Sequence, residues 1–126
     1  MNRFTPYAAV VLRFAVGAVF LSHGIQKWHT GLAGVGNFLH SLGIPFAPVF
    51  AVVVIALETV GAVCLLLGIM TRVIALGLAI EMAVAIPLAV LPRAPELEAL
   101  LLAGALALVA LGDGPLSIGI RFKKTT

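Results

Sequence analysis

The 126-residue chain is 62% hydrophobic, only 10% charged, and has a mean hydropathy of +1.19. Soluble domains carry about 25% charged residues, so this composition excludes a water-soluble globular protein and predicts one that crosses a membrane several times. The net charge of +3 gives no nucleic-acid signal, because three of the eight basic residues lie in the last six positions. The single cysteine, Cys64, excludes an internal disulfide and a C-x-x-C redox pair.

Four apolar segments predict four membrane-spanning helices, approximately residues 7–26, 48–67, 72–91 and 96–111. Pro6 suits the first turn of the first helix, Gly68 ends the second, and Gly112-Asp113-Gly114-Pro115 ends the fourth. At about 1.5 Å per residue the fourth helix covers only about 25 Å, so it is short or lies in a thinned bilayer. The expected fold is all-α: one domain over residues 1–126, built as a polytopic four-helix bundle.

The longest loop, between Lys27 and Pro48, is predicted to contain a short amphipathic helix. Helical spacing places four apolar residues on one face of it, namely Val35, Phe38, Leu39 and Leu42. Trp28 stands where interfacial aromatic residues tend to lie. The helix is either an anchor in the membrane interface or a lid over the outer mouth of the bundle.

Basic residues predict the orientation of the bundle. Four crossings put both termini and the turn at Arg72 on one side, which holds five basic residues against two, Lys27 and Arg93, on the other. The positive-inside rule then places both termini in the cytoplasm of a bacterial or archaeal cell, with the protein in the inner membrane. No cleavable signal peptide is expected, because the first helix ends in His23-Gly24-Ile25-Gln26-Lys27 rather than at small residues.

Three charged residues lie deep in the apolar segments: Arg13, Glu58 and Glu81. A charge at the bilayer centre costs about 2.5–3.5 kcal/mol even on lenient insertion scales, so such residues are expected to have a partner or a function. Counted from the cytoplasmic helix ends, both carboxyl groups lie about 14–15 Å deep. The sequence therefore predicts an Arg13–Glu58–Glu81 cluster in which one glutamate keeps a proton, because one arginine cannot neutralise two carboxylates.

Further polar residues gather at the outer mouth: His23, Gln26, Lys27, His29, His40, Glu96 and Glu98. Helical spacing predicts that Glu96 points inward, where it would pair with Lys27, and that Glu98 meets water. His23 either contacts a ligand or hydrogen-bonds a neighbour. The three histidines lack metal-ligand spacing, so no metal site is predicted.

Three parts of the chain resemble the DoxX family. They are Leu12-Arg13 with Phe20-Leu21-Ser22-His23-Gly24 and Lys27; Leu57-Glu58-Thr59-Val60-Gly61 leading to Leu67-Gly68-Ile69-Met70-Thr71-Arg72; and Glu96-Leu97 leading to Gly112-Asp113-Gly114-Pro115-Leu116-Ser117-Ile118. The matching positions are Arg13, His23, Lys27, Glu58, Arg72 and Glu96. Glu81 departs from the family pattern, where an apolar residue is usual, and Asp113 replaces the commoner proline.

The resemblance implies a small four-helix membrane protein that serves a redox system. Some relatives are membrane parts of a thiosulfate:quinone oxidoreductase, and others belong to a thiol-oxidant resistance complex with a superoxide dismutase and a sulfurtransferase. The implied partners are the lipid bilayer and a soluble oxidoreductase or sulfurtransferase, and the implied cofactor is a quinone. The residues that would bind quinone or relay protons are Arg13, His23, Lys27, Glu58, Glu81 and Glu96.

Other hypotheses stay open beside the redox subunit. Glu58 and Glu81 could titrate in a carrier for protons or small solutes, or Arg13 and Glu58 could simply lock two helices of a structural protein. An independent enzyme is disfavoured, because the sequence supplies no nucleophile–base pair and no cofactor motif. Arg72 and Asp113 are expected to pair near the cytoplasmic surface, and helix faces rich in glycine and alanine are compatible with a homo-oligomer.

Overall fold

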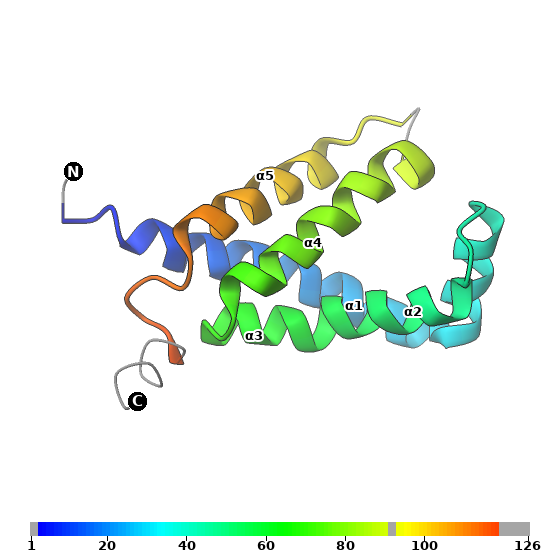
Figure 1. Ribbon diagram of the computed structural model, residues 1–126, viewed down its shortest axis with the longest axis horizontal. Coiled ribbons are helices and arrows are strands. Elements are labelled where there is room, and N and C mark those ends of the chain that lie inside the picture. Colours follow the sequence, from blue (N-terminus) through cyan, green and yellow to red (C-terminus); the bar gives the residue numbers. More distant parts are fainter. Residues whose placement is uncertain (1–2, 91–92, 119–126) are drawn as a thin grey trace.

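The computed structural model describes residues 3–90 and 93–118, and these residues form a bundle of antiparallel helical rods (Figure 1). The rods are α1 (Tyr7–Ser41); α2 (Ala47–Ala56), η1 (Leu57–Gly61) and α3 (Ala62–Leu67) in one line; α4 (Thr71–Ala85) with η2 (Ile86–Val90); and α5 (Glu96–Leu111). α1 packs along α2 and α3, and α4 packs along α5. The prediction of an all-helical bundle is confirmed.

Among the described residues, three helical rods are long and apolar enough to cross a membrane: Tyr7–Ser41, Ala47–Leu67 and Thr71–Val90. α5 has 16 residues and covers about 24 Å, which is less than the roughly 20 residues of an ordinary crossing. The start of α1 and the end of α5 lie at the same end of the bundle (Figure 1). The protein is therefore a helical membrane protein whose fourth helix is short, as its sequence indicated.

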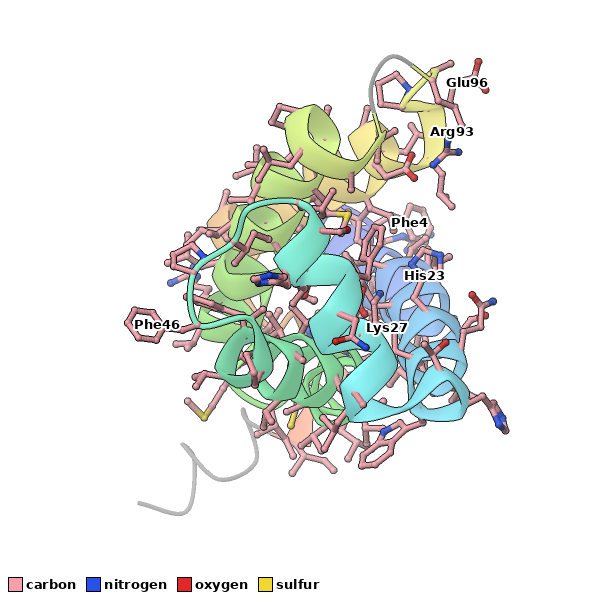
Figure 2. The ribbon with its side chains drawn as sticks, turned by 90° about the vertical axis from the view of Figure 1, so that its right-hand side faces the viewer. Phe4, His23, Lys27, Phe46, Arg93 and Glu96 are labelled. Atoms are coloured by element: carbon pink, nitrogen blue, oxygen red, sulfur yellow. The ribbon has the colours of Figure 1, made fainter. Side chains whose placement is uncertain are left out.

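α1 is longer than predicted and bends at Gly31. The helix continues through the polar residues after Gln26 and breaks at Gly31, whose φ of 86° and ψ of 159° lie in a region open essentially only to glycine. The segment after the bend packs across the start of α2 (Figures 1 and 2), where Val35 and Leu39 contact Ala51 and Ile55. This segment is the predicted amphipathic helix, although Phe38 is 53% exposed rather than packed.

The second rod contains one wider turn. Leu57–Gly61, η1, has π-helical hydrogen bonding and interrupts the α-helical ladder around Glu58. The Thr59 hydroxyl donates a hydrogen bond of 2.6 Å to the carbonyl of Ile55 inside this turn. Single π turns inside α-helices occur frequently at functional sites, so η1 directs attention to Glu58.

A buried apolar layer occupies the middle of the bundle and receives side chains from all four rods. Its members are Val16, Phe20, Ala62, Leu65, Ala75, Leu78, Ala79, Met82, Leu101, Ala105 and Leu108, each no more than 6% exposed. Because this layer is apolar, buried polar side chains can meet only at the two ends of the bundle, on either side of it.

Candidate functional site

Glu58 forms its ion pair with Lys27. Lys27 Nζ lies 2.5 Å from Glu58 Oε2, and the Glu58 side chain is completely buried while that of Lys27 is 33% exposed. Figure 2 looks onto this end of the bundle, where Lys27 lies next to the part of α1 that follows the bend. Two predicted contacts are thereby wrong, because Glu58 does not pair with Arg13 and Lys27 does not pair with Glu96.

Glu81 from α4 completes the cluster. Its carboxyl group is close enough to Glu58 and to Lys27 to interact electrostatically with both. This proximity agrees with the expectation that the two carboxyl groups lie at about the same depth. Glu58 Oε1 and Glu81 Oε1 are both buried without a hydrogen-bond partner among the described residues. Two carboxylates cannot donate to each other, so a proton on one of them would supply the missing donor.

The close approach of α1 to η1 sets this pairing. A Cβ atom at Gly24 would lie 2.7 Å from the Glu58 carbonyl oxygen and 2.5 Å from Thr59 Cγ2. Only a glycine therefore allows α1 to lie directly on the turn that carries Glu58. Lys27 comes three residues later on the same face of α1, so its ammonium group can reach the carboxyl group of Glu58.

We expect Gly24→Ala to push α1 away from η1 and to lower the free energy of unfolding by about 1–3 kcal/mol, because the added methyl group meets backbone. Gly36→Ala is the matched control, since its Cβ would lie 3.8 Å from the nearest atom, Pro48 Cα. Thermal unfolding in one detergent measures both variants. Equal midpoints for the two would contradict the close approach at Gly24.

Arg13 lies at the opposite end of the bundle and is fully buried. Its guanidinium donates hydrogen bonds to the carbonyls of Leu65 (3.3 Å), Leu66 (3.4 Å) and Leu116, and it interacts electrostatically with Asp113. The last carbonyls of a helix lack intrahelical partners, so Arg13 caps α3 and holds the segment after α5 against it. Eleven residues, or about 16 Å of helix, separate Arg13 from Gly24, which explains why it cannot meet Glu58.

Arg72 and Asp113 also lie at this end, and each makes a hydrogen bond to a backbone group of the other's neighbourhood. Arg72 donates to the Ala110 carbonyl at 3.3 Å, and Asp113 Oδ1 accepts from the Thr71 N–H at 3.2 Å. Together with Arg13 they join the end of α5 to the turn between α3 and α4, a structural role.

The sequence of this chain matches a known family over a segment that includes the Lys27–Glu58–Glu81 cluster and Arg13. Residues 8–91, about two thirds of the chain, match DoxX. The chain belongs to the DoxX family. The match includes Arg13, Lys27, Glu58 and Glu81, whereas Glu96 lies beyond it.

Two curated relatives support the assignment to DoxX. The chain is 43% identical over 84 residues to "Uncharacterized membrane protein Rv3486" of Mycobacterium tuberculosis, covering 66% of this chain and 51% of that protein. It is 32% identical over 74 residues to "Putative oxidoreductase CatD" of Bacillus subtilis, covering 59% of this chain and 53% of that protein. The chain thus spans about half the length of the curated relatives it matches. No solved structure matches it.

The remaining predicted residues of this DoxX protein lie outside the cluster or at its edge. His23 is half-buried on α1, with its ring edge-on to Phe20 at 6.4 Å between centroids. Glu96 is exposed, and Figure 2 shows it well away from Lys27. Glu98, predicted to meet water, instead pairs with Arg93 at 3.4 Å and is 17% exposed. The inward and outward positions predicted for Glu96 and Glu98 are therefore reversed.

His40 lines a groove of about 480 Å³ between the segment after Gly31 and the start of α2. The walls are mainly apolar and include Leu32, Gly36 and Pro48. No group of three or more histidine, cysteine, aspartate or glutamate side chains comes together in a metal-binding arrangement within residues 3–90 and 93–118.

Proposed function

We propose that this DoxX protein is the membrane subunit of a redox system, and that Lys27, Glu58 and Glu81 form the site that exchanges protons with a quinone-type electron carrier. One observation carries the proposal: two carboxyl groups and a single ammonium group meet inside a membrane bundle. Ionisable residues at membrane depth are costly and rare, and they typically mark proton relays or the pathways of ions and substrates.

Charge balance makes this cluster a store for one proton. The Lys27 ammonium compensates one carboxylate, and a second, partly buried carboxylate beside it would be uncompensated, so one of the two glutamates keeps its proton. Removing or adding that proton changes the net charge of the cluster by one unit inside a medium of low dielectric constant. A change of charge nearby, such as the reduction of an electron carrier, would therefore be coupled to the proton of the cluster.

The residues at the mouth offer the polar groups that a quinone headgroup would need. Such a group, when bound, supplies electron transfer coupled to proton uptake. The partly exposed Lys27 ammonium would hold a carbonyl oxygen, and the Glu58 carboxyl directly behind it would keep or release a proton. The buried Oε1 atoms of Glu58 and Glu81, which have no hydrogen-bond partner among the described residues, are acceptors suited to this task.

The partner and the orientation belong to the same proposal. The Bacillus subtilis relative bears the name of an oxidoreductase, and a soluble oxidoreductase or sulfurtransferase would supply the electrons or substrate of a thiosulfate:quinone or thiol-oxidant resistance system. Arg3 and Arg72 lie at the end of the bundle opposite Lys27 and Arg93. The positive-inside rule would place that end in the cytoplasm and the Lys27 mouth on the outer face of the inner membrane.

The test is extraction from native membranes in a mild detergent, followed by mass spectrometry of the bound proteins and lipids. We expect a stoichiometric oxidoreductase or a retained quinone with the wild-type protein. We expect less retained quinone with Glu58→Gln at an unchanged yield of folded protein. A clean protein that carries only phospholipid would contradict the redox role and favour a carrier or a structural protein.

A further inference from the structure

We infer that the Lys27–Glu58–Glu81 cluster exchanges protons with only one face of the membrane, the face at which α1 bends at Gly31 and α4 connects to α5. The inference rests on the proposed function, which makes the cluster a proton-exchanging site. It adds a direction: protons enter and leave through the Lys27 mouth and do not cross the bundle.

The cluster reaches the mouth through the side chain of Lys27, and Glu81 is partly exposed as well. One third of that side chain is exposed, while its Nζ atom touches the completely buried carboxyl group of Glu58. Glu81 lies behind Glu58 on α4. These contacts form a short relay from the mouth through Lys27 and Glu58 to Glu81. The other titratable or charged groups towards this face are His23 and His29 on α1, His40 after the bend, Arg93 before α5, and Glu96 and Glu98 on α5.

The closed side is the apolar layer. Every rod contributes to it between its two polar ends: Phe20 on α1, Leu65 on α3, Leu78 on α4 and Leu108 on α5 are all 0% exposed. Leu65 comes seven positions after Glu58, so the layer extends about 10 Å from Glu58 along that rod. Close-packed apolar side chains leave no room for a chain of water molecules, and apolar voids stay dry.

The polar residues beyond the layer do not continue the relay. Arg13 is buried and engaged with the carbonyls of Leu65, Leu66 and Leu116. Its fixed positive charge opposes the entry of a proton from that end, as arginines do in pores that exclude protons. The two polar clusters are therefore electrically and sterically separate.

The test uses the full chain in liposomes sorted by orientation. The orientation is read on a separate portion from whether external trypsin cleaves at Arg93, an exposed residue of the Lys27 face. The external pH is changed rapidly while the pH inside the liposomes is held constant. Infrared absorption of the protonated carboxyl groups is followed over time, and it is assigned to the cluster by its loss in Glu58→Gln and Glu81→Gln. We expect the signal to follow the external pH at once when the Lys27 face is outward. With the opposite orientation it should be at least about tenfold slower, limited by leakage through the apolar bilayer and bundle.

Equal rates in both orientations, or no carboxyl signal in either, would overturn the inference. Leu65→Ser, which places a hydroxyl in the layer, should speed the response from the Arg13 face, whereas Leu67→Ser, at a position 42% exposed on the same helix, should not. The mild-detergent extraction is judged independently. A retained quinone with equal rates would refute only the direction, and a one-sided signal without a redox partner would refute only the redox role.

Discussion

Replacing Lys27 by methionine is expected to lower the free energy of unfolding by about 3 kcal/mol, because it leaves the fully buried Glu58 carboxyl group without a counter-charge. The partial exposure of Lys27 places the effect at the lower end of what breaking a buried ion pair costs. In a mild detergent the midpoint of thermal unfolding should fall by on the order of 10 °C.

The double variant Lys27→Met, Glu58→Gln separates lost charge balance from lost packing. With no carboxylate at position 58, the methionine no longer strands a charge, so most of the lost stability should return. A double variant that is as unstable as the sum of the two single variants would show that Lys27 and Glu58 do not act as a pair.

Replacing Arg13 by alanine is expected to cost about 3–5 kcal/mol, because the change leaves three carbonyl groups without their donor and removes the charge that faces Asp113. The loss of stability should be greatest in the segment after α5, which Arg13 holds against the end of α3. Hydrogen exchange at the amides of residues 113–117, with thermal unfolding of the whole protein, measures both effects.

Arg72→Ala is the matched control for Arg13→Ala. Arg72 is exposed and makes a single hydrogen bond of 3.3 Å to the Ala110 carbonyl, so its loss should cost less than about 1 kcal/mol. Arg13→Lys keeps the positive charge but not the several N–H donors of the guanidinium group, so it should recover only part of the free energy of unfolding that Arg13→Ala loses. If Arg13→Ala proved no less stable than Arg72→Ala, the capping role of Arg13 would be wrong.

The residues of the site were predictable from the sequence, but their pairing was not. Arg13, Gly17, Gly24 and Lys27 share one face of α1, so helical spacing identifies the face that looks inward without saying which residue meets Glu58. That choice depends on the register of α1 against the second rod, which is set by the contact of Gly24 with the η1 backbone. The proximity of Glu58 and Glu81 could be predicted from their depth alone, because both residues are about equally far along their helices from the turn that joins α3 to α4.

Predictions failed where a helix starts or bends. Helical spacing placed Glu96 inward, but Glu96 is the first residue of α5 and extends past the packed part of the bundle, while Arg93 draws Glu98 to itself. The bend at Gly31 was also missed, because a glycine in a polar stretch indicates the end of a helix as readily as a break within a longer one.

The most direct test of the proposed role measures whether the proton of the cluster responds to electron transfer. Infrared difference spectra of the purified protein with a short-chain quinone, recorded while an electrode reduces and reoxidises the quinone, detect such a change. We predict a carboxyl band that accompanies reduction in the wild type and in Arg72→Ala, and that is lost in Glu58→Gln and Glu81→Gln. A spectrum without that band, or a band that survives both glutamine variants, would contradict a redox-coupled proton at Lys27, Glu58 and Glu81.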